Sequence, residues 1–125
     1  MPTPSSDSAK VTFLDVPAAV RRVRSAAEQA RASDPNIVAV VLFGSLATGG
    51  ATPASDADVL VLLRHDSRRV LDRIPDYSRA FEGLGLAVQV FPWTAAELTR
   101  RLAEHDRFAR EILDTGITVA GTIPL

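Results

Sequence analysis

The chain contains no cysteine, which excludes disulfide bonds, thiolate metal sites and a cysteine nucleophile. No apolar run approaches the roughly 20 residues that a membrane-spanning helix needs, so we expect no contact with a membrane. An excess of charge of one sign is also missing, because 14 Lys and Arg residues against 15 Asp and Glu residues give a net charge of −1. This balance argues against strong nucleic-acid binding over a broad surface, although it does not exclude a local basic patch.

The length and composition predict one folded domain. The 125 residues suffice for a single core, and hydrophobic residues make up 46% of them. Residues 1–10 are rich in Ser and Pro and predict a flexible tail, so we expect the domain to span residues 11–125. The first residues are polar and lack the charged-then-apolar pattern of a signal peptide, which favours a cytoplasmic protein.

Two carboxylates stand at the start of the second of two apolar runs in the middle of the chain. The runs 37–43 and 59–63 read as buried strands, and Asp56 and Asp58 stand at the start of the second. Side chains alternate along a strand, so the two carboxylates share one face at a spacing of about 6–7 Å. They repel each other and resist burial unless a cation lies between them. Mg²⁺ suits this position because it takes oxygen ligands and usually binds substrate phosphates as well.

The first apolar run ends in Gly44-Ser45, which suits a phosphate. Gly44 allows the backbone to approach a ligand closely. The Ser45 hydroxyl and the neighbouring N–H groups can donate to an anion, particularly if a short helical turn begins at residues 45–48. One half of this stretch thus suits a metal ion and the other half a phosphate group.

The spacing of these residues resembles a known family. Gly44-Ser45, ten intervening residues and then Asp56-x-Asp58 resemble the signature of the nucleotidyltransferase superfamily that includes DNA polymerase β, and the short chain resembles its minimal nucleotidyltransferase branch. The resemblance covers roughly residues 16–119. It implies an α/β (α+β) fold, with a small mixed sheet flanked by helices and a site at one end of the first two strands. The alternative is an unrelated α/β domain in which the carboxylates only cap a loop.

The resemblance also implies a reaction. Asp56 and Asp58 would be catalytic ligands of Mg²⁺ or Mn²⁺, and Gly44 and Ser45 would bind the β and γ phosphates of a nucleoside triphosphate. The family transfers a nucleoside monophosphate, here AMP from ATP, to a hydroxyl acceptor. Minimal members often act as antitoxins beside a small helical toxin of the HEPN type, so the resemblance implies a protein partner or acceptor as well as a nucleotide.

The sequence departs from the family at two places. Gln89 stands at the third-carboxylate position of the family, and a neutral amide neither acts as a base nor neutralises a metal charge. Leu46 and Thr48 stand where members often carry arginines, which removes cationic help for a triphosphate. These departures favour an alternative in which a catalytically weak or inactive module of the same fold acts by binding a partner or a nucleotide.

Apolar periodicity and turn residues predict alternating helices and strands along the chain. Strands are predicted at 37–43, 58–63, 86–91 and 117–119. Helices are predicted from Pro17 to about residue 33, after a cap at Asp66 or Ser67, from the capping box Thr94–Glu97 onward, and over 108–113.

Several single residues carry further expectations. Pro75 should end or kink its helix and Pro92 should end the third strand, because proline lacks a backbone donor. We expect His65 and His105 on the surface, and we expect Trp93 to pack on the core or the sheet edge rather than to stack on a nucleobase.

Overall fold

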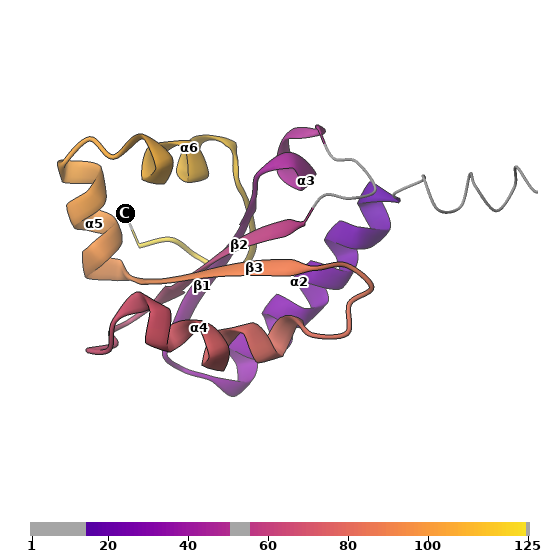
Figure 1. The fold of residues 1–125 in the computed structure, drawn as a ribbon, viewed down its shortest axis with the longest axis horizontal. Coiled ribbons are helices and arrows are strands. Elements are labelled where there is room, and N and C mark those ends of the chain that lie inside the picture. Colours follow the sequence, from indigo (N-terminus) through magenta and orange to yellow (C-terminus); the bar gives the residue numbers. More distant parts are fainter. Residues whose placement is uncertain (1–14, 51–55, 125) are drawn as a thin grey trace, which may run out of the picture.

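The computed structural model describes residues 15–50 and 56–124 (Figure 1). The tail predicted at 1–10 and most of the loop before Asp56 therefore lie outside the described residues. The elements follow in the order α2 (Val16–Ser33), β1 (Ile37–Phe43), α3 (Ser45–Thr48), β2 (Ala57–Leu63), α4 (Val70–Ser78), η1 (Arg79–Phe81), β3 (Val88–Thr94), α5 (Ala95–Ala103), α6 (Arg107–Thr115) and β4 (Ile117–Gly121).

The four strands form one mixed sheet in the order β3-β2-β1-β4. β1 is antiparallel to both β2 and β4, whereas β3 is parallel to β2. The predicted fold class is thus confirmed. This connectivity brings the carboxyl end of β1 and the amino ends of β2 and β3 to the same end of the sheet.

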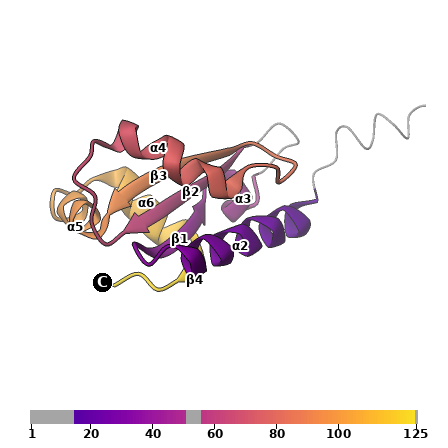
Figure 2. The same ribbon diagram turned by 90° about the horizontal axis from the view of Figure 1, so that it is seen from below.

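Helices cover both faces of the sheet, which explains why β1 and β2 are almost continuously apolar (Figures 1 and 2). α2 and η1 cover one face, where Val23 and Phe81 join a core that includes Val40 and Val59. α5 and α6 cover the other face, with a core made of Ala39, Val41, Phe43, Leu60, Leu62, Trp93, Leu98, Ala109 and Ile112.

Side-chain caps start three of the helices. The Asp15 carboxylate accepts the Ala18 N–H at 3.1 Å, and Pro17 occupies the first turn of α2 as predicted. The capping box of Thr94 and Glu97 is also confirmed, and it starts α5 directly after β3. Asp106 caps α6, so that α5 and α6 follow each other with only a short bend between them.

Two expectations about local structure were wrong, and one was wrong in part. The third strand runs on to Thr94 and includes Pro92, because β3 is an edge strand and proline is tolerated where its missing N–H faces outward. Of the end or kink predicted at Pro75, the end is excluded, because α4 continues to Ser78 with Pro75 on its exposed side. Neither predicted cap starts α4, because Asp66 instead accepts hydrogen bonds from Arg68.

A buried arginine holds α4 against the end of β3. The Arg73 side chain is only 3% exposed and forms two hydrogen bonds to the Glu97 carboxylate, at 2.7 and 3.0 Å. Its remaining donors reach the backbone carbonyls of Pro92, Asp66 and Arg68 at 2.6–3.0 Å. These bonds satisfy the charge in a buried position, where an unpaired guanidinium would be strongly destabilising.

The carboxylates of this network are held in their charged forms. The hydrogen bond from Arg73 lowers the pKa of Glu97 below its ordinary value. The hydrogen bond from the Arg68 guanidinium is the main reason that the pKa of Asp66 falls to about 2.

Among the helices of the described residues, none combines the length and the apolarity that a bilayer crossing requires.

Replacing Arg73 with Met tests this network. We expect the free energy of unfolding to fall by about 3–5 kcal/mol, because the Glu97 carboxylate and three backbone carbonyls lose their donor. Urea denaturation followed by circular dichroism measures the change. In the control Arg69→Ala, an 82% exposed side chain that pairs with Asp72 is removed, and the loss should stay below about 1 kcal/mol. Equal stability of Arg73→Met and wild type would contradict the role of the network.

Candidate functional site

The register of the strands brings the predicted site residues together. Asp58 is paired with Phe43, the last residue of β1, and on its other side with Gln89 of β3. Directly paired residues project from the same face of a sheet, and Asp56 lies two residues before Asp58. The Asp56, Asp58 and Gln89 side chains therefore share the face that α5 and α6 cover farther along the strands.

Gly44 lies directly against the Asp58 carboxylate. Its backbone has φ 78° and ψ −154°, a conformation that is essentially restricted to glycine. A Cβ atom at this position would overlap Oδ2 of Asp58. Because no side chain intervenes, the backbone at the start of α3 and the carboxylate of β2 border the same space.

α3 begins at Ser45, directly after the glycine that contacts Asp58. The Gly44 carbonyl accepts the N–H groups of Ala47 and Thr48 at 3.0 and 3.1 Å, which closes the first helical turn. The N–H groups that precede Ala47 in this turn have no partner inside the helix. Such donors, together with the Ser45 hydroxyl, are suited to binding phosphate oxygens.

The electrostatics of the carboxylate pair favour a bound cation. Asp58 is half-buried, and its pKa is raised above the ordinary value. Burial is the larger cause, and the neighbouring charge of Asp56 is the smaller one. Within residues 15–50 and 56–124, no ion pair joins an arginine to Asp58. A divalent cation between the two carboxylates would relieve both the burial and the repulsion.

The set of oxygen donors fits one Mg²⁺ ion better than two. Mg²⁺ is typically held by one or two carboxylates and completes its shell with water and phosphate oxygens. Asp56 and Asp58 supply two carboxylates, and Gln89 adds only a neutral amide oxygen. In the part of the chain that the structure describes, no cluster of three or more His, Cys, Asp or Glu side chains is placed to hold a metal.

No cationic side chain follows the Gly-Ser pair on α3. Leu46 is only 2% exposed and belongs to the core beside α2, and the Thr48 hydroxyl donates to the Gly44 carbonyl at 3.2 Å.

His65 and His105 are both exposed, as predicted. Trp93 lies in the core at 3% exposure with the Arg101 guanidinium 4.0 Å from the ring centroid, so it does not offer its face to a base.

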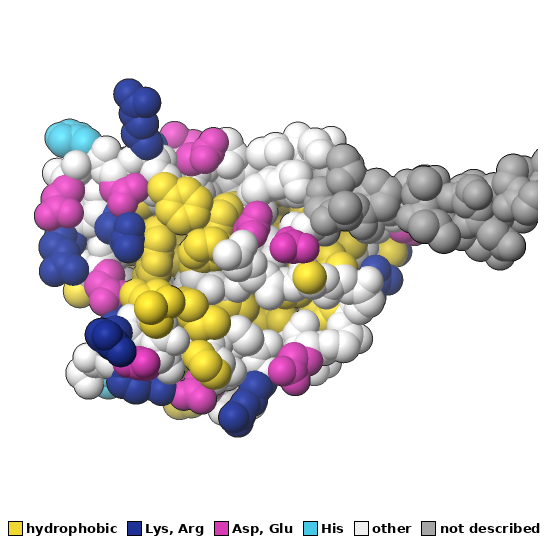
Figure 3. Space-filling model, viewed as in Figure 1, with side chains coloured by type: hydrophobic (Ala, Val, Ile, Leu, Met, Phe, Trp, Pro, Cys, Tyr) yellow, Lys and Arg dark blue, Asp and Glu magenta, His cyan; other side chains and the backbone are white. Residues whose placement is uncertain are grey.

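An aromatic cluster beside the carboxylates was not predicted. Phe43, Phe91 and Phe108 contact one another with ring centroids 5.3–5.6 Å apart, and Phe108 is 39% exposed. In Figure 3, apolar side chains gather on this face between α6 and α4. The period of two along the strands could have revealed part of the cluster, because Phe91 follows Gln89 by two residues and Phe43 directly precedes Gly44.

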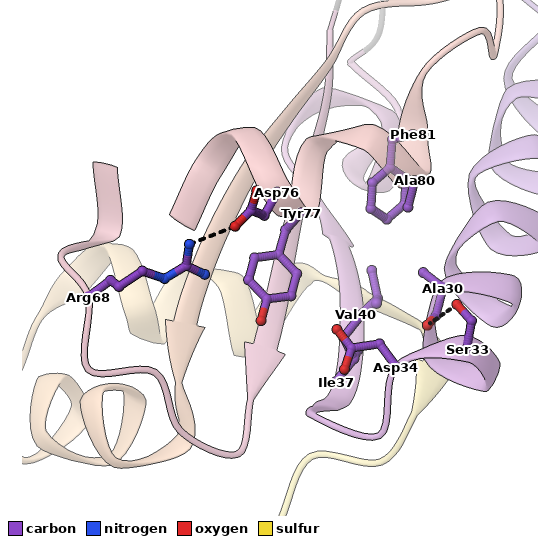
Figure 4. Close-up of a pocket in the computed structure, with 10 residues that line it drawn as sticks. All are labelled: Ala30, Ser33, Asp34, Ile37, Val40, Arg68, Asp76, Tyr77, Ala80 and Phe81. Carbon is purple, nitrogen blue, oxygen red and sulfur yellow. Dashed lines mark hydrogen bonds and ion pairs between the residues drawn. The ribbon is translucent and has the colours of Figure 1, made fainter. Parts of the chain in front are cut away.

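A separate hollow of about 320 Å³ lies on the opposite face of the sheet (Figure 4). It is bordered by the end of α2, by Tyr77 of α4 and by Phe81 of η1. Arg68 lies at its edge and is paired with Asp76 at 2.6 Å. None of the predicted site residues borders this hollow, so it is distinct from the candidate site.

The mixed sheet and the contact between Gly44 and Asp58 agree with a known class of protein. Residues 21–119 match the family model of the nucleotidyltransferase domain, and the chain belongs to this family. The predicted family is thus confirmed. No match was found among curated proteins.

Solved structures share this fold. A candidate nucleotidyltransferase from Sulfolobus solfataricus has a TM-score of 0.56 at 23% identity, over 85% of this chain and 86% of that chain. A chain from a toxin–antitoxin structure with AMP-PNP has a TM-score of 0.47 at 18% identity, over 87% of this chain and 75% of that chain. The second likeness is too remote to bear on function.

The substitution Gly44→Ala tests the contact between Gly44 and Asp58. We expect a loss of about 1–3 kcal/mol of stability from the backbone conformation alone, together with a displaced Asp58 carboxylate. Urea denaturation measures the first effect, and the carbon-13 chemical shift of the Asp58 carboxyl group measures the second.

The matched control is Gly49→Ala, at another left-handed glycine. Gly49 has φ 88°, but a Cβ there would meet nothing within 4 Å. The control should lose about 1–2 kcal/mol and leave the Asp58 signal unchanged. If Gly44→Ala also left that signal unchanged, the proposed close approach would be disproved.

Proposed function

We propose that this chain is a metal-dependent nucleotidyltransferase that transfers AMP from ATP to a hydroxyl group on an acceptor outside the chain. The contact of the Gly44 backbone with the Asp58 carboxylate carries the proposal, because N–H groups suited to a phosphate then lie close to a carboxylate pair suited to a cation. Membership of the nucleotidyltransferase family supports a transferase. The proposal includes a protein acceptor, such as a HEPN-type toxin with this chain as its antitoxin.

The proposed site residues divide into three roles. Asp56 and Asp58 hold Mg²⁺ or Mn²⁺, and the bound metal supplies stabilisation of negative charge on the phosphate oxygens. Gly44 and Ser45 bind the β and γ phosphates through their N–H groups and the Ser45 hydroxyl. Gln89 orients a ligand through its amide and takes no proton.

The transfer itself is a displacement at the α-phosphorus. The acceptor oxygen forms a bond to this phosphorus while the bond from phosphorus to the bridging oxygen of the pyrophosphate breaks. Pyrophosphate leaves, and the proton of the acceptor hydroxyl passes to water. The site contributes mainly by positioning and by electrostatic stabilisation, as is usual in phosphoryl chemistry.

A second candidate function is a binding module with little or no catalysis. Gln89 favours it, because the residue paired with Asp58 on β3 carries no charge. The buried Leu46 and the bonded Thr48 also favour it, since neither side chain can neutralise a triphosphate. In this alternative the chain binds a nucleotide or a partner and transfers nothing.

Calorimetric titration with ATP, with and without Mg²⁺, tests the site shared by both functions. We expect binding that depends on Mg²⁺ and weakens at least about tenfold in Asp58→Ala, since even the loss of an outer-shell partner weakens metal sites by about 10–100-fold. Glu28→Ala, which removes an exposed carboxylate of α2, should bind like wild type. A wild-type protein that binds no nucleotide would sink the transferase and would leave only a module that binds a partner.

The substitution Gln89→Asp separates the two functions. It adds a negative charge next to Asp58, and Gln89→Asn is the matched neutral control. Transfer of labelled AMP to candidate partner proteins or to water is measured for all three proteins. If wild type transfers label and Gln89→Asp changes the rate less than about tenfold, the native site is catalytic. Detectable transfer by Gln89→Asp with an undetectable wild-type rate would identify the binding module, since single electrostatic stabilisers change rates by about 10²–10³.

A further inference from the structure

An open hollow of about 540 Å³ lies between α4 and the first half of β3. Asp56 borders it where β2 and β3 begin, and residues 87–91 line one of its sides. The residues that α4 contributes are Val70, Leu71, Ile74 and Ser78. Small-molecule sites in proteins usually measure about 300–1,000 Å³, so the hollow has the size of such a site.

The lining of the hollow is mostly apolar and carries no positive charge. Leu71 is 74% exposed, the most exposed of the large apolar side chains described, and Phe91 is half-buried. Asp56, Gln89 and Ser78 supply the polar side chains, and no arginine or lysine within residues 15–50 and 56–124 lines the hollow. An occupant would therefore bury an apolar body, and the Asp56 carboxylate disfavours an occupant with a negative charge.

The proposed transfer determines the side from which its acceptor arrives. In phosphoryl transfer, the attacking and leaving oxygens lie roughly in line, on opposite sides of the phosphorus. Gly44 follows β1 and contacts Asp58 from that side, so the leaving pyrophosphate of the proposed function lies on the β1 side. The acceptor oxygen then arrives from the β3 side, where Gln89 is paired with Asp58 and borders the hollow.

The shape of the hollow favours a free molecule over a side chain of a partner protein. α4 lies along the outer side of β3, and Arg73 binds the Pro92 carbonyl, so a partner backbone cannot pair with this strand. A volume of about 540 Å³ also exceeds that of any single side chain. One inserted residue would therefore leave part of the apolar lining uncovered.

From this geometry we infer that the hollow between α4 and β3 is the acceptor site, and that the acceptor is a small molecule with a hydroxyl group on an apolar body and no negative charge. Leu71, Ile74 and Phe91 contact the apolar body, and the hydroxyl lies beside Gln89. The inference rests on the proposed function and narrows its acceptor, so that a protein acceptor becomes the alternative outcome of the tests.

The transfer to this acceptor balances as in the proposed function. The hydroxyl oxygen forms a bond to the α-phosphorus of ATP while the bond from phosphorus to the bridging oxygen of the pyrophosphate breaks. Pyrophosphate leaves, the hydroxyl proton passes to water, and the product is a phosphodiester of AMP. A sugar is a poor acceptor here, because the apolar lining would leave its other hydroxyl groups without hydrogen-bond partners.

Four probes test the chemistry of the hollow. Neutral para-ethylphenol, cationic tyramine and anionic para-hydroxyphenylacetate have similar shapes, and glucose is the polar control. NMR titrations of the full chain follow the amides of residues 87–91 and the methyl groups of Leu71 and Ile74. We expect the neutral and cationic phenols to shift these signals, and the anionic phenol and glucose to bind at least about tenfold more weakly. Glucose or the anionic phenol binding as tightly as para-ethylphenol, or no shift with either expected ligand, would overturn the inference.

The substitution Leu71→Lys tests where the phenols bind. It adds a positive charge to the wall of the hollow at an exposed position, and Leu71→Met is the matched apolar control. We expect the affinity for tyramine, relative to that for para-ethylphenol, to fall about two- to fivefold in Leu71→Lys, since exposed charge pairs have effects of this size. The ratio should stay unchanged in Leu71→Met. An unchanged ratio in Leu71→Lys, with the wild-type circular dichroism spectrum, would overturn the inference.

Transfer of labelled AMP from ATP to each probe tests the acceptor role. With Mg²⁺ present, we expect mass spectrometry to detect the AMP phosphodiesters of para-ethylphenol and tyramine and none of glucose. Transfer to a partner protein but to neither phenol would overturn the inference and leave the proposed function. Phenol binding by a protein that never binds ATP would overturn the transferase and the acceptor role together, whereas ATP binding without phenol binding would overturn the inference alone.

Discussion

The close approach of the Gly44 backbone to the Asp58 carboxylate determines how the candidate site is built. It requires a glycine conformation at the end of β1, and it places the start of α3 across the antiparallel pair from β2. Asp58 is then half-buried next to Asp56, which is unfavourable for two carboxylates unless a cation is present. The glycine conformation and the burial of Asp58 thus meet in the same contact, and the proposed metal ion would offset the burial.

The Arg73 network holds α4 in place at the end of β3 that lies away from the candidate site. By binding Glu97 and the Pro92 carbonyl, the buried guanidinium joins α4 to the end of β3 and to the first turn of α5. The bonds lie at the far end of β3, and α4 runs from there along the outer side of the strand. A network with no part in the proposed chemistry therefore fixes the helix that covers this side of the sheet.

The sequence allowed most of the fold to be predicted, because the strands and helices depend on local patterns. Apolar runs defined β1 and β2, and residue alternation was the basis for expecting Asp56 and Asp58 on one face, which remains a prediction about the site. The misassigned Pro92 shows the limit of local rules. Whether Pro92 ends a strand depends on which side of the strand lacks a neighbour, and that is a property of the sheet. The buried role of Arg73 depends in the same way on contacts between residues distant in the sequence.

The single tryptophan and the single tyrosine lie in different layers of the fold. Trp93 is buried between the sheet and the helices α5 and α6, whereas Tyr77 packs against the core on the α2 side. The two side chains absorb and emit at different wavelengths, so each layer carries its own natural fluorophore. Tryptophan emission follows the loss of packing under α5 and α6, and tyrosine emission follows the layer under α2, without any introduced label.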